Sequence, residues 1–236
     1  MQKNKPLLPE KELARYEVKI PIPFTSLSEI TPFIMLDPAG FSKEYPDRVV
    51  NSLYYDSHNL DSYADNLSGG GCRTKFRLRW YNESTTCTKL TAEAKIKRNH
   101  VGWKEKADIT LPKPLDNMPF TQLSKSITEQ ISNETLLSVF RENTSPTMLI
   151  SYHRQYYCSN NKKIRITIDS KIQYYNQHFS QVLAHSIAPV TCDNVILECK
   201  FLVCDKEEAN RVIRSSPFRP WKNSKYVIGV KMTNYF

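Results

Sequence analysis

Basic side chains alternate with apolar ones along one short segment, in a spacing that suits phosphate binding. Within residues 75–80 the odd positions are Lys75, Arg77 and Arg79, and the even positions are all apolar. Because successive side chains of a β-strand point to opposite faces, the three cations share one face. Lys and Arg donate charge-assisted hydrogen bonds to phosphate oxygens, so this face suits a polyanionic ligand.

The same alternation returns in four other segments. The charged positions that share a face within each segment are Arg15, Glu17 and Lys19; Glu93, Lys95 and Lys97; Lys163, Arg165 and Asp169; and Glu198 and Lys200. A solvated sheet usually mixes both signs, because like charges on neighbouring strands repel. The excess of cations over these segments therefore favours a sheet face that lies against a polyanion.

The overall composition agrees with an anionic partner but does not identify it. The 236 residues include 33 Lys and Arg against 24 Asp and Glu, a formal charge of +9. Nucleic acid, an acidic membrane surface and phosphorylated small molecules all fit this surplus. Hydrophobic residues make up 40% of the chain, which excludes wholesale disorder. We see no signal peptide, transmembrane run or linker, and expect one domain over residues 1–236 in the cytoplasm.

Strands dominate the expected secondary structure. Period-two alternation and Ile, Val, Tyr and Thr content predict strands at Arg15–Pro21, Val49–Asp56, Arg73–Tyr81, Lys89–Lys97, Lys104–Leu111, Met148–Cys158, Lys163–Ile172, Val195–Val203 and Tyr226–Met232. Capping boxes and helical spacing predict helices at 26–34, 121–141 and 205–216. The pattern alone leaves two architectures open, a barrel with its charges inward and a sandwich with a charged, solvated face.

Other familiar motifs are missing or weak. The six cysteines form no C-x-x-C pair and no zinc spacing with histidine, so we interpret them as reduced thiols. The Gly69-Gly70-Gly71 run lacks a following Gly-Lys-Ser/Thr and is therefore no P-loop. We expect it to connect two strands, and we expect the five histidines to be structural or superficial.

Eight short motifs, in order along nearly the whole chain, resemble those of a known family. They are Arg15-Tyr-Glu-Val-Lys19, Ser52-Leu-Tyr-Tyr-Asp56, Lys75-Phe-Arg-Leu-Arg-Trp-Tyr81, Glu93-Ala-Lys95, Tyr152-His-Arg154, Arg165-Ile-Thr-Ile-Asp169, Leu197-Glu-Cys-Lys200 and Ser224-Lys-Tyr226. This series resembles the VTC domain, the polyphosphate-polymerase branch of the triphosphate tunnel metalloenzymes and a relative of the CYTH domain. Each motif is weak alone, and their shared order gives the resemblance its weight.

The resemblance implies a mainly β, α+β fold: a closed antiparallel barrel of about eight strands that forms a charged tunnel, with a few peripheral helices. It implies that the γ-phosphate of ATP passes to a growing polyphosphate chain, releasing ADP. The implied phosphate ligands are Lys19, Arg77, Arg79, Lys95, Arg154, Arg165, Lys200 and Lys225. Further substrate contacts are expected from Lys75, Lys97 and Arg15. Mn²⁺ or Mg²⁺ is expected at Glu198, with Glu17 and Glu93 as secondary ligands.

One departure from the related hydrolytic enzymes bears on the reaction. They carry Glu-x-Glu-x-Lys on the first strand, and Arg15 stands at the first Glu position here. One carboxylate fewer weakens the case for an activated water, which favours a polymerase. A triphosphate hydrolase and a non-catalytic binder of polyphosphate or inositol polyphosphate remain open. Nucleic acid is not expected as a partner, because the aromatics mostly alternate away from the cations. A membrane-protein partner for export, at the inner face of a membrane, and the oligomeric state are left open.

Overall fold

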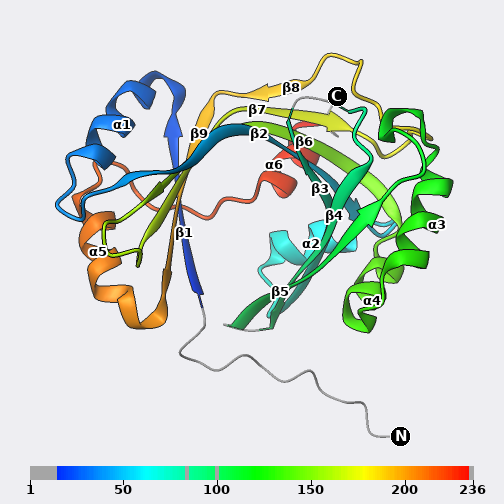
Figure 1. Cartoon of the computed structure of the whole chain (residues 1–236), viewed down its shortest axis with the longest axis horizontal. Coiled ribbons are helices and arrows are strands. Elements are labelled where there is room, and N and C mark those ends of the chain that lie inside the picture. Colours follow the sequence, from blue (N-terminus) through cyan, green and yellow to red (C-terminus); the bar gives the residue numbers. More distant parts are fainter. Residues whose placement is uncertain (1–14, 83–84, 99–100, 234–236) are drawn as a thin grey trace, which may run out of the picture.

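Nine antiparallel strands form one curved sheet in the computed structural model, which describes residues 15–82, 85–98 and 101–233 (Figure 1). The strands are β1 (Arg15–Pro23), β2 (Ser42–Asp56), β3 (Cys72–Tyr81), β4 (Lys89–Arg98), β5 (Val101–Thr110), β6 (Ser145–Cys158), β7 (Arg165–Asn176), β8 (Val190–Cys192) and β9 (Asn194–Leu202). Their order across the sheet is β1-β9-β7-β6-β2-β3-β4-β5, and β8 pairs with β7. The sheet bends into an arch, whose concave side we call the inner face.

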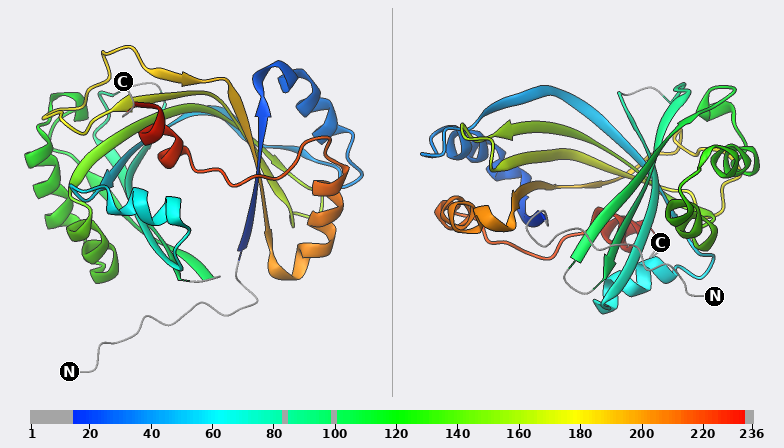
Figure 2. Two further views of the ribbon diagram at one scale, coloured as in Figure 1. Left: turned by 180° about the vertical axis from the view of Figure 1, so that it is seen from behind. Right: turned by 60° about the horizontal axis from the view of Figure 1, so that its bottom comes forward.

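The sheet is not closed into a barrel by hydrogen bonds, so the expected closed tunnel is wrong in this respect. Within the described residues β1 and β5 are edges that pair with one neighbour each. Pro21 and Pro23 leave β1 without two of the N–H groups that a further strand would need. The segment between the last two helices crosses β1 instead, where the N–H of Trp221 donates to the carbonyl of Lys19 at 3.0 Å (Figure 2).

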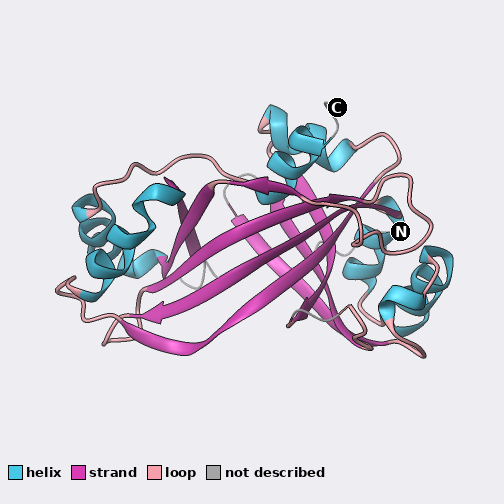
Figure 3. Cartoon of the chain, turned by 90° about the horizontal axis from the view of Figure 1, so that it is seen from above, coloured by secondary structure: helices cyan, strands magenta, loops and turns pink. Residues whose placement is uncertain are grey.

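In the described part of the chain six α-helices accompany the sheet, and four of them cover its outer face at the two ends (Figure 3). The helices are α1 (Leu27–Met35), α2 (Asp61–Ser68), α3 (Phe120–Gln130), α4 (Glu134–Glu142), α5 (Lys206–Ser215) and α6 (Lys225–Thr233). Short 3-10 helices lie at Phe24–Ser26, Leu115–Asn117 and Val203–Asp205. Helices α1 and α5 pack on apolar side chains of β1, β7 and β9, and α3 and α4 pack on those of β2 to β5.

This outer packing fixes which face of each strand turns inward. In β3 the side chains of Phe76 and Leu78 are fully buried in the cluster with α3 and α4. Since side chains alternate, Lys75, Arg77 and Arg79 must lie on the inner face. The register carries this face to the next strand, because Arg77 lies opposite Glu93 and Lys75 opposite Lys95.

Several expected elements differ from the structure. Residues 226–232, expected as a strand, belong to the helix α6, which places Tyr226 and Val230 one turn apart on apolar side chains of β6 and β7. Gly229 makes this contact possible, since a Cβ there would stand 2.6 Å from Tyr174 Cδ1. The expected helix at 121–141 is two helices, α3 and α4. Helix α2 and strand β8 were not expected.

The local helix signals were only partly right. Ser26 and Asp205 precede α1 and α5 as expected, but neither side chain makes a capping hydrogen bond. The glycine run does not simply connect two strands, because Gly69, with a φ of 78°, ends α2 before β3 begins. A left-handed residue after a helix favours glycine, which explains its position there.

Candidate functional site

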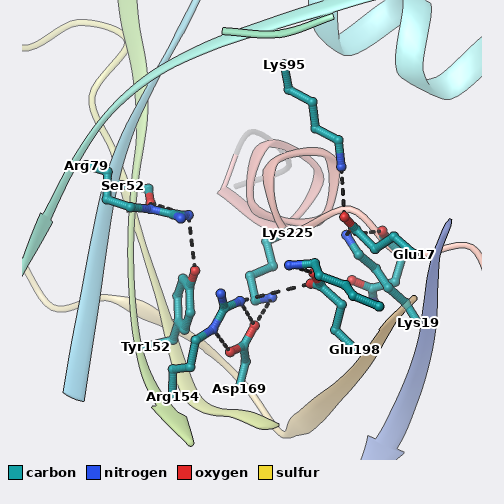
Figure 4. Close-up of polar contacts among 12 residues, drawn as sticks. Glu17, Lys19, Ser52, Arg79, Lys95, Tyr152, Arg154, Asp169, Glu198 and Lys225 are labelled. Atoms are coloured by element: carbon teal, nitrogen blue, oxygen red, sulfur yellow. Dashed lines mark hydrogen bonds and ion pairs between the residues drawn. The ribbon is translucent and has the colours of Figure 1, made fainter. Parts of the chain in front are cut away.

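The inner face gathers cations from β1, β3, β4, β6, β9 and α6 around a few buried carboxylates (Figure 4). Three acidic side chains act as centres of this network: Glu93, Glu198 and Asp169. Each is at most 5% exposed, so its charge must be balanced by neighbouring cations. The cations outnumber the carboxylates, and this surplus is the main electrostatic feature of the face.

Glu93 holds the β3 cations. Its carboxylate contacts Arg77 Nη2 at 2.6 Å and Lys104 Nζ at 2.5 Å, with Arg79 Nη1 at 3.7 Å. Lys106 of β5 follows at 3.9 Å. Burial alone would raise the pKa of Glu93, but Arg77, Arg79 and Lys104 together hold it well below its usual value. Glu93 is therefore ionised at neutral pH and orients Arg77 and Lys104.

Glu198 and Glu17 form a second acidic centre, on the neighbouring strands β9 and β1. Lys200 Nζ contacts Glu198, and Lys19 and Lys95 each contact Glu17 at 3.0 Å. Burial raises the pKa of Glu17 and so does Glu198, but Lys19, Lys95 and Lys200 outweigh both and lower it to about 2. The Lys95–Glu17 pair joins β4 to the edge strand β1, which is not its neighbour in the sheet (Figure 4).

Asp169 is fully buried and binds two cations from different elements. Arg154 donates through Nε and Nη2 to its two carboxylate oxygens at 2.5 and 2.7 Å, and Lys225 of α6 donates at 2.5 Å. Arg165 begins β7, opposite Lys200 in the register, and its half-exposed side chain lies 3.8 Å from Glu44. The bidentate contact fixes the guanidinium plane of Arg154 on the inner face.

Lys75 is the cation whose surroundings most clearly lack an anion. Its Nζ donates to Ser224 Oγ at 2.9 Å, and the described residues place no carboxylate within ion-pair distance of it. Burial lowers the pKa of Lys75, and Lys19, Lys95, Arg73 and Arg77 lower it further, to about 7. A phosphate oxygen beside this amine would remove that penalty.

The structure thus brings most of the expected residues together. Lys19, Lys75, Arg77, Arg79, Lys95, Arg154, Lys200 and Lys225 all contribute to the inner face. Lys97 lies further along the same face of β4, where burial and then Arg73 and Lys95 lower its pKa. The backbone of Arg15 begins β1, but its side chain lies outside the described residues. Lys163 precedes β7 and contacts Asp205 and Glu208 instead.

Sequence reasoning missed several inner-face residues. Tyr54 Oη accepts from Arg77 Nη1 at 2.8 Å, and Tyr152 Oη accepts from Arg79 Nη2 at 3.4 Å. The expectation that aromatics avoid the cationic face is therefore wrong in β2 and β6. In β2 the adjacent Tyr54 and Tyr55 must point to opposite faces, and in β6 Tyr152 shares the face of Arg154, two residues further on. Lys104 and Lys106 of β5 were missed because the sequence does not show which residues of the next strand lie opposite Glu93.

The outer face offers a contrast. Between the two helix pairs, a hollow of about 270 Å³ is lined by Asn51, Ser151, His153 and Gln173, among others. It lies behind the sheet from the cation network, because these positions alternate with the inner-face positions. Within the described residues, no three His, Cys, Asp or Glu side chains lie close enough together to hold a metal ion. No helix in the described part of the chain is long and apolar enough to span a membrane.

Comparisons with known proteins place the chain in a family. No curated protein matches it. Among the solved structures that match is one from Vibrio parahaemolyticus described as a "putative adenylate cyclase", with a TM-score of 0.49 and 9% sequence identity over 91% of this chain and 97% of that chain. The sequence model of the VTC domain matches residues 14–234, nearly the whole chain. The chain therefore belongs to the VTC domain family.

Proposed function

We propose that the protein is a metal-dependent polyphosphate polymerase, which transfers the γ-phosphate of ATP to a growing polyphosphate chain and releases ADP. The surplus of cations on the inner face carries this proposal. Lys75 in particular is partly buried among cations and has a lowered pKa of about 7. Such a face is unfavourable when empty and becomes favourable when a polyanion neutralises it.

The cations divide naturally into two groups. The buried ones, among them Arg79, Arg154 and Lys225, sit deepest and suit the triphosphate of the nucleotide. Lys19, Arg77, Lys95, Arg165 and Lys200 complete the proposed phosphate ligands. Lys75, Lys97 and Arg15 are proposed to hold the incoming chain. Phosphoryl transfer needs alignment and charge neutralisation more than covalent help, and a row of fixed cations provides both.

A divalent cation fits the second acidic centre. Cations hold the pKa of Glu17 and of Glu198 below the usual value, so both are ionised, and Glu198 by itself raises the pKa of Glu17. A Mg²⁺ or Mn²⁺ ion between them would relieve this repulsion. Mg²⁺ is commonly held by one or two carboxylates together with substrate phosphates and water. When bound there it would neutralise charge on the triphosphate. Glu93 is already engaged by cations, and its role as a metal ligand stays a secondary proposal.

The acceptor chemistry agrees with the absence of a histidine from the proposed machinery. The terminal oxygen of a polyphosphate chain is already ionised, so no base has to remove a proton from it. His153 lies on the outer face, and His58 and His178 stack on each other with centroids 5.9 Å apart. The protein's own task is then to bind, align and exclude competing water.

A triphosphate hydrolase is the second candidate, favoured by the proximity of Glu17 to Glu198. Two carboxylates could support a metal and an attacking water. A binding module without turnover is the third. These contacts do not support nucleic acid as a ligand. A membrane partner that would export the product, and ATP and polyphosphate as the ligands, are parts of the same proposal.

Product analysis separates these candidates. The protein is incubated with ATP and Mn²⁺, and ADP, orthophosphate and polymeric phosphate are measured by phosphorus NMR and gel electrophoresis. A polymerase yields ADP and polymer with little orthophosphate. Orthophosphate that rises in step with ADP, without polymer, would establish the hydrolase. No ADP with any divalent metal would leave only the binding module.

A further inference from the structure

A cluster of tyrosines surrounds one arginine at the end of the inner face. The guanidinium carbon of Arg48 lies 5.5 Å from the ring centroid of Tyr45 and 5.0 Å from those of Tyr81 and Tyr156. The rings of Tyr45 and Tyr156 meet edge to face, 5.6 Å apart. Within the described residues no carboxylate pairs with Arg48, so aromatic faces are its partners. We call these four residues the tyrosine–arginine platform.

The platform continues the line of proposed phosphate ligands. Tyr81 follows Arg79 by two residues on β3, and Tyr156 follows Arg154 by two on β6. Two residues along a strand span about 6.6 Å and return to the same face. Arg48 lies opposite Arg154 in the register of β2 and β6, and the guanidinium of Arg154 is 6.0 Å from the ring of Tyr156. The platform is thus the next step along the face beyond Arg79 and Arg154.

The platform is accessible. Tyr45 is 46% exposed and Tyr81 is 42% exposed, which is unusual for large aromatics that only fill a core. The pairing of β2 with β6 slips on both sides of Tyr45. Such bulges turn side chains to new directions and are common beside binding sites.

We infer that the tyrosine–arginine platform holds the nucleobase of the nucleoside triphosphate whose phosphates bind the neighbouring cations. Unpaired bases stack on tyrosine rings and on arginine guanidinium planes. The inference rests on the proposed function, because it assumes that a triphosphate occupies the inner face. Stacking uses the flat face that all bases share, so the platform distinguishes a nucleotide from an inorganic polyphosphate and does not distinguish adenine from guanine.

The test compares a ligand that has a base with one that does not. Calorimetry measures the binding of ATP, GTP and inorganic tripolyphosphate to the wild-type chain and to Tyr81→Ala. Loss of one stacking ring should weaken ATP and GTP by about 5- to 150-fold and leave tripolyphosphate unchanged. Tyr81→Phe keeps the ring and should restore ATP binding. Tyr16→Ala, which removes an equally exposed tyrosine that packs on Phe201, is the matched control and should change neither.

Each outcome decides the matter. Equal losses for ATP and tripolyphosphate, or unchanged ATP binding in Tyr81→Ala, would overturn the platform. Arg48→Gln provides the same comparison if Tyr81→Ala fails to fold. A wild-type chain that binds neither ligand would overturn both the proposed function and this inference. A selective loss of ATP binding in a chain that makes no polymer would support the platform and contradict the polymerase alone.

Discussion

Glu93 and Glu198, two of the three acidic centres of the inner face, are both buried and differ in their neighbours. Glu93 meets cations from β3 and β5, and its charge is compensated within the protein. Glu198 also meets cations, Lys200 and Arg154, but unlike Glu93 it lies close enough to other carboxylates to raise the pKa of Glu17 and of Asp169. Crowded carboxylates attract a divalent ion, whereas a carboxylate ringed by cations orients them. The comparison teaches that burial and charge alone do not mark a metal ligand.

The largest effect, on turnover, is expected when Glu198 and Glu93 are replaced in separate variants. In Glu198→Gln the shape stays and the charge is lost, and turnover should fall by about 100-fold or more, since metal stabilisation is worth several kcal/mol. Tripolyphosphate affinity should largely remain. Glu93→Gln is the matched variant and should lose less turnover. Steady-state ADP release with Mn²⁺ measures both, and equal losses in the two variants would break the comparison.

Arg79→Ala should weaken triphosphate binding by about 10- to 150-fold, the worth of one hydrogen bond to a charged group. Arg79 makes only long contacts, at 3.4 Å to Ser52 and Tyr152 and at 3.7 Å to Glu93, which keeps Arg77 and Lys104, so its loss should cost the free protein little stability. Lys163→Ala removes the same charge from a lysine that contacts Asp205 and should leave affinity unchanged. Calorimetry that shows the same tripolyphosphate affinity for both variants would remove Arg79 from the site.

The pKa of Lys75 predicts a pH effect of defined sign. It is lowered from 10.5 to about 7 in the folded protein, so between these values the unfolded chain binds a proton that the folded chain does not. The contribution of Lys75 to the stability of the ligand-free protein therefore becomes more favourable as pH rises from about 7 to 10. Binding of a triphosphate restores the charge, so Lys75 should take up a proton near pH 8.

That proton uptake can be measured by calorimetry of tripolyphosphate binding at pH 8, in buffers that differ in ionisation enthalpy. Lys75→Met should bind fewer protons than the wild type and should lose part of the affinity. Lys104, whose pKa burial and Arg77 also lower to about 7, contributes a background that both proteins share. Identical uptake in the two proteins would show that Lys75 does not meet the phosphates.

The smallest effect concerns the packing of α6 on the sheet, which places Lys225 beside Asp169. Gly229→Ala would place a Cβ 2.6 Å from Tyr174 Cδ1 and push α6 away from the sheet. Overpacking of this kind typically costs about 1–3 kcal/mol. Gly70→Ala, where a new Cβ would lie 3.8 Å from Ser68 Oγ, serves as the control. Urea unfolding that shows equal stability for both variants would mean that α6 is not held this tightly.

Much of the inner face could be predicted from the sequence because strand alternation is a local property. The shared face of Lys75, Arg77 and Arg79 could be predicted from the period of two and from the apolar residues between them. The partners of Asp169 could not be predicted, since its bond to Lys225 joins positions 56 residues apart and depends on the placement of α6. That helix was misjudged because Tyr226–Met232 is rich in β-branched and aromatic residues, and tertiary packing on Tyr174 decided its state.

Whether the sheet closes into a barrel could not be predicted from the sequence either. The two prolines of β1 indicate an edge strand. Only the structure shows that the segment around Trp221 crosses this strand. The platform residues Tyr45 and Arg48 were missed for a related reason. Both precede the expected strand Val49–Asp56, and the bulges that break the alternation of β2 around Tyr45 hide the first part of this strand in the sequence pattern.

The central claim, that a nucleotide and its metal meet at the Glu198 side of the inner face, is tested most directly by crystallography. Crystals are grown with Mn²⁺ and a non-hydrolysable ATP analogue, and anomalous diffraction locates the metal. We predict a manganese peak within bonding distance of Glu198, with the γ-phosphate against Arg77 and Arg79. A manganese peak at Glu93, or a nucleotide in the outer hollow lined by His153, would contradict the account.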